Sequence, residues 1–292
     1  MEYALIVIST VLFGGQFIAL NAYQEKNGKA FRSILFFTLL FSLIGMFLFA
    51  CLRGFNIGFS PYTLLYSGIA AILQLVLQFA GMIALSRGRV EVYTLFNVSG
   101  SMSVAYIFGI TFFQEQIKVA HIVGLLLIIF CLIIPMLFDK KETRRFDFIF
   151  YVLCFVVFLS NGFFGVTNKI HIVSSQGLSI DEYMFYLYLW IGVISSIALS
   201  ISLFKKDNGF KEMIKPYPIL FGLLYGLLNS AGMAMQYAFA DKIPASILFP
   251  LSNGGCIFFG LVIGCIAYKK KPKLQDIIQM IVSISGMVLF II

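Results

Sequence analysis

Apolar stretches of about 20 residues, the length that crosses a bilayer as a helix, follow one another along the chain between short polar connectors. A lone apolar segment in lipid must satisfy its backbone hydrogen bonds internally, so each stretch is expected to be a helix. The short alternating strands typical of a membrane barrel are absent from the sequence. The pattern predicts ten spans, at residues 3–22, 31–52, 62–85, 92–113, 119–138, 146–173, 183–204, 219–240, 245–268 and 274–292.

The composition agrees with a protein that lies almost wholly in the membrane. The chain is 60% hydrophobic and 12% charged, whereas about a quarter of a soluble domain is charged. Its longest polar segment, residues 205–218, is too short to form a soluble domain. We therefore predict an all-α integral membrane protein, in the plasma or inner membrane, with the lipid bilayer as its surroundings.

One part of the sequence occurs twice. Met82 to Lys118 aligns without a gap on Met235 to Lys271 after a shift of 153 positions. Each copy ends one apolar span, crosses a short charged turn and runs through a second span to a polar edge. Fixed-period self-similarity is the mark of a repeat architecture. The chain is predicted to consist of two five-helix repeats, residues 1–138 and 146–292, joined by a basic connector at residues 139–145.

The charges of the connectors predict how the two repeats are oriented. Four basic residues lie in or beside the even-numbered connectors, namely Arg53, Lys118, Lys169 and Lys242, which leaves 17 of the 21 beside the odd-numbered ones. Basic connectors stay in the cytoplasm, and equivalent connectors of the two repeats carry opposite bias. The repeats are therefore predicted to be inverted, with both termini outside the cytoplasm. This orientation accounts for the net charge of +8 without a nucleic-acid partner.

Polar side chains inside the apolar spans are the candidates for substrate binding, because such groups are costly in a membrane unless they have partners. Many of them recur at helical spacing and so share one face of their span. An alternative role is hydrogen bonding between helices, worth about 0.6–2 kcal/mol each. The predicted substrate-binding residues are Gln16, Gln78, Tyr93, Asn97, Ser101, Asn161, Asn168, Tyr225, Asn229, Gln236 and Asn253.

Other residues suggest gating, packing or a place at the membrane surface. Pro250 removes a backbone hydrogen bond from its span, so it can bend the helix as a gate or as a static kink. The pairs Gly222/Gly226 and Gly260/Gly264 have the spacing of close helix packing. The basic Lys169 and aromatic His171 lie near the outer end of their span, where the lysine is expected to reach the interface rather than bind an anion. Spans five and ten have few interior polar residues, which predicts peripheral helices.

The ionisable residues limit the chemistry. All 13 acidic residues fall at span ends or in connectors, which disfavours a proton carrier at mid-membrane. Glu115 is the candidate coupling residue, with a polar anchor at a helix end as its alternative role. The two histidines have no acidic partner at helical spacing, so no catalytic residues are assigned and an enzyme is not expected. The five cysteines form no C-x-x-C pair, and we expect buried free thiols, no metal site and no cofactor.

Three local motifs accompany the repeat. They are Phe13 to Phe17 in the first span, Ala245 to Pro250 in the ninth, and Phe112 to Glu115 at the end of the fourth. With the ten spans in two inverted halves, they resemble the drug/metabolite transporter superfamily, specifically its EamA-type ten-helix members. The sequence departs from the family pattern at Asn97, where the first half would have a proline, and at Tyr268, where the second glutamate would stand. The resemblance covers nearly the whole chain and implies a central cavity surrounded by spans one, three, four, six, eight and nine.

The expected function is a transporter for a small neutral or zwitterionic, amino-acid-like metabolite, working by alternating access as an exporter, facilitator or exchanger. An amide- and tyrosine-lined cavity suits such a substrate. A proton-coupled multidrug or cation exporter is one alternative, and a passive channel is another. The protein is expected to be a monomer or a homodimer.

Overall fold

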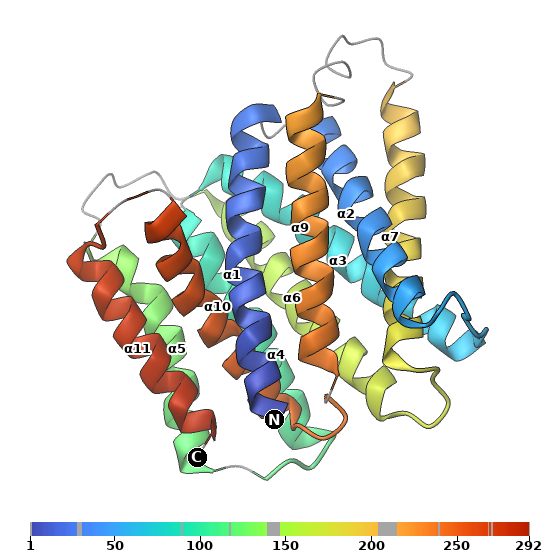
Figure 1. Cartoon of the computed structure of the whole chain (residues 1–292). Helices are drawn as coiled ribbons and strands as arrows, with labels where there is room; N and C mark the ends of the chain where they lie inside the picture. The colour runs from blue at the N-terminus through green and yellow to red at the C-terminus, as the bar shows by residue number, and fades with distance from the viewer. Residues whose placement is uncertain are drawn as a thin grey trace.

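The computed structural model describes residues 2–27, 31–88, 90–116, 118–138, 147–203, 215–238, 240–267, 269 and 271–291. Every element in these ranges is an α-helix (Figure 1). The helices are α1 Glu2–Asn27, α2 Phe31–Leu52, α3 Pro61–Arg87, α4 Val90–Thr111, α5 Val119–Phe138, α6 Phe148–Val173, α7 Ile180–Leu203, α9 Pro216–Tyr237, α10 Ala245–Ala267 and α11 Leu274–Ile291. They match the ten predicted spans to within a few residues. The predicted connector 139–145 lies outside the described residues.

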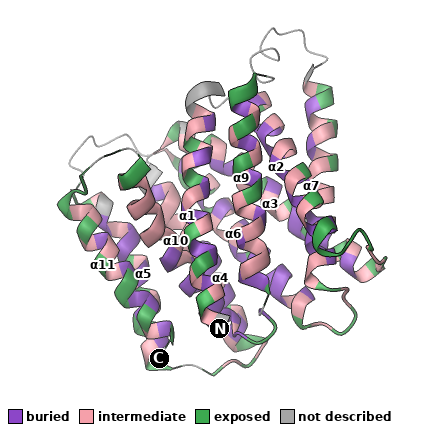
Figure 2. Cartoon of the chain, viewed as in Figure 1, coloured by how far each residue is buried: buried purple, intermediate pink, exposed green. Residues whose placement is uncertain are grey.

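The helices have the length and composition of a multi-pass membrane protein. Nine of those described are long and apolar enough to cross a bilayer. The tenth, α4, falls below that level of hydropathy because Asn97, Ser99, Ser101 and Ser103 lie along it. Large apolar side chains such as Phe47, Leu126 and Ile281 are exposed, and Figure 2 shows exposed residues recurring along the helices. Lipid can cover these side chains, since its tails are as apolar as the side chains themselves.

The helices alternate in direction, which brings both chain ends to one end of the bundle (Figure 1). We call this the lower end, as it is drawn there, and it also holds the connectors α2–α3, α4–α5, α6–α7 and α9–α10. The opposite end is called the upper end. Helices distant in sequence pack together: α1 with α9 and α10, α2 with α7 and α9, α3 with α6 and α7, α4 with α5, α6 and α10, and α11 with α5 and α10.

Small residues stand where helices cross most closely. A Cβ added at Gly14 of α1 would lie 2.9 Å from the backbone nitrogen of Gly260 in α10, and one at Gly226 would lie 2.9 Å from the Cα of Phe41. Gly226 and Gly222, whose added Cβ would meet Leu40, are close-packing positions as predicted. The prediction was wrong for Gly264, where nothing lies within 4 Å of an added Cβ.

Candidate functional site

A cavity of about 640 Å³ lies in the middle of the bundle. Residues of α1, α3, α4, α5, α6, α9, α10 and α11 line it. Its polar lining is made of amide, hydroxyl and thiol side chains, and none of its described lining residues is acidic, basic or a histidine. These polar residues are Gln16, Asn21, Gln74, Thr94, Asn97, Ser101, Asn161, Tyr225, Asn229, Gln236, Tyr237, Ser252, Asn253, Cys256 and Gln279.

Amide side chains in the cavity wall hydrogen-bond to one another across helix boundaries. Asn229 of α9 donates from Nδ2 to Oε1 of Gln16 in α1 (2.9 Å) and accepts from the Tyr188 hydroxyl (2.8 Å). Asn161 of α6 donates from Nδ2 to Oδ1 of Asn97 in α4 (2.8 Å). Asn229 is thus bonded at both its oxygen and its nitrogen, whereas the Gln16 nitrogen and the Asn161 oxygen are left able to face a ligand. Cavity lining and hydrogen bonding between helices are therefore roles of the same residues.

The α10 wall is built in the same way. Asn253 donates from Nδ2 to the Ser101 hydroxyl (3.0 Å) and to its own helix at the Phe249 carbonyl (2.8 Å). Gln236 of α9 donates from Nε2 to the Ser252 hydroxyl (2.9 Å). Pro250 is buried within α10, which continues through it, so the structure places the predicted gate inside a single helix beside these polar residues.

Eight of the eleven predicted substrate-binding residues line the cavity: Gln16, Asn97, Ser101, Asn161, Tyr225, Asn229, Gln236 and Asn253. The other three belong to helix packing instead. Gln78 donates to the Thr38 hydroxyl of α2 (2.7 Å), and Tyr93 packs against Gly81, where an added Cβ would lie 2.5 Å from its hydroxyl. Asn168 is fully buried between two tyrosine hydroxyls.

The sequence analysis left several lining residues unassigned. Thr94 and Ser252 are one helical turn or less from predicted residues, so their spacing could have included them. Gln279 corrects the expectation that the tenth span is peripheral, since it is 7% exposed and donates to the Cys131 carbonyl of α5 (3.0 Å). Cys256 also lines the cavity. Cys51 is exposed, so the expectation that all the thiols are buried was wrong there.

The cavity extends from near the upper end of the bundle down to Tyr237, the last residue of α9. Its lining reaches Asn21, Thr94 and Leu261, each within six residues of the upper end of its helix. Below the cavity, the Tyr183 hydroxyl donates to Asn168 Oδ1 (2.7 Å), and Asn168 Nδ2 donates to the Tyr237 hydroxyl (2.9 Å). This buried chain joins α6, α7 and α9 and forms a polar floor.

Two charged residues hold the turn between α9 and α10, residues 240–244, below this floor. Lys169 of α6 is only 3% exposed and donates from Nζ to the carbonyls of Ala240 and Ile243. The expectation that Lys169 reaches the interface was therefore wrong. Glu115, from the α4–α5 connector, accepts from the backbone N–H groups of Ala245 (2.6 Å) and Ser246 (2.9 Å). Glu115 therefore anchors the start of α10 and not the end of α4, the helix that it follows in the chain.

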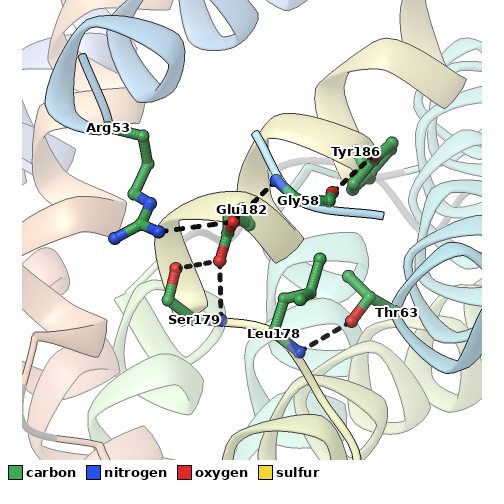
Figure 3. A network of polar contacts seen from close by, with 7 residues as sticks. All are labelled: Arg53, Gly58, Thr63, Leu178, Ser179, Glu182 and Tyr186. Carbon is green, nitrogen blue, oxygen red and sulfur yellow. Dashed lines mark hydrogen bonds and ion pairs between the residues drawn. The ribbon is translucent and has the colours of Figure 1, made fainter. Parts of the chain in front are cut away.

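A second network joins the α2–α3 and α6–α7 connectors at the lower end (Figure 3). Glu182 is 4% exposed and accepts from the backbone N–H of Gly58 (2.8 Å) and from the Ser179 N–H (3.0 Å) and hydroxyl (2.7 Å). Arg53 lies 3.4 Å from its carboxylate. Figure 3 also shows Leu178 donating its backbone N–H to the Thr63 hydroxyl (2.9 Å). Both connectors are thus held together by a carboxylate.

Sequence reasoning missed this network, although a signal for it was present. Ser179 and Glu182 have the Ser-x-x-Glu spacing of a capping box, and the glutamate accepts from the Ser179 backbone N–H at the start of its helix. His171 lies in the same region, with its ring stacked 4.2 Å from that of Tyr183 and its Nε2 3.0 Å from the Thr63 hydroxyl. Within the described ranges, no group of three or more His, Cys, Asp or Glu residues is placed to hold a metal ion.

Comparisons with known proteins give the fold alone. No family model matches the chain, and no curated protein matches it. Among solved structures, 29 chains match. One of them, a crystal structure described only as that of a protein, matches 98% of this chain and 95% of its own, with a TM-score of 0.74 and 14% sequence identity. At that identity the likeness shows a shared fold, and it assigns no activity.

Proposed function

We propose that the protein is a transporter that carries a small neutral or zwitterionic metabolite across the plasma or inner membrane by alternating access. The observation that carries this proposal is the polar cavity in the middle of an apolar bundle, which reaches toward the upper end and has the buried Tyr183–Asn168–Tyr237 chain at its lower side. Transporters commonly hold their substrate near the midplane, between two repeats that rock against each other. A lining of amides and hydroxyls suits a substrate with uncharged hydrogen-bonding groups.

The packing of the helices supports two inverted repeats, residues 1–138 and 146–292. Exchanging α1, α2, α3, α4 and α5 with α6, α7, α9, α10 and α11, in that order, turns the pair α1–α9 into α6–α3. It likewise turns α1–α10 into α6–α4, α2–α9 into α7–α3 and α10–α11 into α4–α5, all of which are observed pairs. The pairs α2–α7, α4–α10 and α5–α11 map onto themselves. This is the packing expected of halves related by a two-fold axis, and the resemblance to the EamA-type drug/metabolite transporters points the same way.

The proposal is tested with the purified protein in lipid vesicles. A panel of neutral and zwitterionic metabolites is first screened for thermal stabilisation, because a ligand that binds only the folded state raises its stability. The best stabiliser is then followed as labelled substrate exchanging with unlabelled substrate inside. We expect saturable and competable exchange that proceeds without a pH gradient. Unsaturable flux or a steady current would indicate a channel, and accumulation driven only by a pH gradient would indicate proton coupling.

Asn229→Leu and Gln236→Leu are each expected to weaken the apparent affinity for that substrate. Removing a hydrogen-bond partner from a buried ligand group costs about 1–3 kcal/mol, or roughly 5- to 150-fold in affinity. Gln78→Leu is the matched control, because Gln78 bonds Thr38 and does not line the cavity. Affinities are measured by competition on folded, monodisperse protein. If the two cavity variants behave like the control, the substrate site lies elsewhere.

A reporter that is active only outside the cytoplasm should be active when fused after Ile292. The reason is the excess of Lys and Arg in the odd-numbered connectors, which favours a cytoplasmic upper end. The same reporter fused after Phe138, at the upper end of α5, should be inactive. Reversed activities would place the lower end in the cytoplasm and contradict the orientation.

A further inference from the structure

The α9–α10 turn, residues 240–244, is held by two opposite charges that come from different parts of the chain. The Glu115 carboxylate accepts hydrogen bonds from two backbone N–H groups at the start of α10. The Lys169 ammonium donates two hydrogen bonds to carbonyls of the turn. Both charged groups are therefore satisfied by main chain. Among the described residues, no ion pair joins Glu115 to Lys169.

The sign of each charge suits the backbone groups that it meets. Free N–H groups at a helix start favour an anion, and free carbonyls favour a cation. Exchanging the two charges would therefore repel the turn from both sides. The carboxylates that act electrostatically on the Lys169 ammonium are those of Glu115 and Asp241, and Asp241 is exposed on the turn itself.

The Glu115 carboxylate is built into the packing between α4 and α10. A Cβ added at Gly109 of α4 would lie 2.3 Å from Oε2 of Glu115 and 3.4 Å from the backbone nitrogen of Ser246. Gln114 adopts a left-handed conformation (φ 52°), and the Glu115 N–H donates back to the Gly109 carbonyl (3.0 Å). A non-glycine residue held at positive φ is uncommon, and here it directs the next side chain at α10.

We propose that Glu115 and Lys169 exchange partners during the transport cycle. In the present state both hold the α9–α10 turn against the floor of the cavity; when the turn withdraws and the cavity opens toward the lower end, they pair with each other. The inference rests on the proposed transport function. Its physical reason is that withdrawal would otherwise leave the buried Lys169 ammonium without its carbonyl acceptors and the half-buried Glu115 carboxylate without its N–H donors, which is unfavourable. Pairing cancels both charges, so the change of state needs no added ion.

Cys256 provides a native reporter, because it lines the cavity. With Cys51 and Cys265 replaced by alanine, the remaining thiols, Cys131 and Cys154, are fully buried. A membrane-impermeant thiol reagent is applied to the upper or the lower face, in vesicles of known orientation. The parent protein should label faster from the upper face, and adding Cys256→Ala should abolish labelling from both.

The charge-exchanged double variant Glu115→Lys with Lys169→Glu separates the proposal from a merely structural role. Its charges repel the turn in the present state but can still pair with each other. We expect folded protein by size exclusion, with labelling of Cys256 from the lower face raised at least about tenfold, a shift of about 1.4 kcal/mol in the conformational equilibrium. Each single change should yield less folded protein than the double. A double variant that labels like the parent, or that is as poorly folded as the singles, overturns the proposal.

Glu115→Gln gives a second test that does not depend on the double variant. The amide oxygen can still accept an N–H of α10, but the side chain can no longer pair with the Lys169 charge. Partner exchange therefore predicts slower labelling from the lower face than in the parent. Faster labelling would mean that Glu115 only holds the α9–α10 turn in the present state, and would overturn the proposal. Labelling needs no substrate, so failure here leaves the transport proposal to be decided by the exchange assay.

Discussion

Gly100→Ala is expected to destabilise the protein by about 3 kcal/mol, near the top of the range for overpacking. A Cβ at this position of α4 would lie 2.2 Å from the Phe158 carbonyl oxygen and 2.7 Å from its Cα in α6. Backbone cannot rotate out of the way as a side chain can, so the two helices must separate. Gly162 of α6 faces the same crossing, with an added Cβ 2.8 Å from the Gly100 carbonyl oxygen. The crossing adjoins Asn97 and Ser101, so the cavity wall should shift as well.

The measurement is thermal unfolding of purified protein in detergent, with recovery by size exclusion as a second readout. Gly264→Ala is the matched control, because nothing lies within 4 Å of its added Cβ. That change should be neutral or stabilising by up to about 1 kcal/mol, the difference in helix propensity between glycine and alanine. Equal unfolding temperatures for the two variants would contradict the close α4–α6 crossing.

Glu182→Ala is expected to lower stability by at least about 4 kcal/mol, since hydrogen bonds to a charged group contribute about 1.5–3 kcal/mol each. The carboxylate accepts three hydrogen bonds, from Gly58 and from two groups of Ser179, and the variant leaves all three donors without their acceptor. The Arg53 contact adds little, because the Arg53 side chain is 38% exposed. The α2–α3 and α6–α7 connectors should also become more sensitive to protease.

Asp181→Ala is the control for this variant. Asp181 is the neighbouring acid in the first turn of α7, and its removal costs only the favourable effect of a negative charge at a helix start, about 0.5 kcal/mol. Glu182→Gln should fall between the two, because it keeps an acceptor oxygen and loses the charge. If Glu182→Ala and Asp181→Ala unfold at the same temperature, the network in Figure 3 does not hold the connectors together.

The helices could be predicted from the sequence to within a few residues. Two of them, Phe31–Leu52 and Val119–Phe138, have the predicted bounds. The reason is local, since roughly 20 apolar residues in lipid have few conformations other than a helix. Eight of the predicted polar residues line one cavity for a similar reason: helical spacing puts them on one face, and a polar face is unfavourable against lipid.

Distant contacts could not be predicted in this way. Asn168 and Asn161 share a face of α6, yet Asn161 lines the cavity while Asn168 is enclosed between Tyr183 and Tyr237. The spacing along α6 cannot tell a residue that lines the cavity from one that is enclosed. Tyr183 of α7 and Tyr237 of α9 enclose Asn168, and these helices are distant in sequence. Gln78 and Tyr93 left the predicted site for the same reason, since α2 and α3 supply their neighbours.

Charged residues near the helix ends show which features follow from the sequence and which depend on tertiary packing. The sequence by itself determined that this is an all-helical membrane protein, which residues cross the bilayer, and that its carboxylates stand at helix ends, because each follows from hydropathy along a single segment. Only the tertiary structure decided that Lys169 is buried on backbone carbonyls and that Glu115 anchors α10. Their partners lie more than 70 residues away in the chain, so their place depends on how the helices pack.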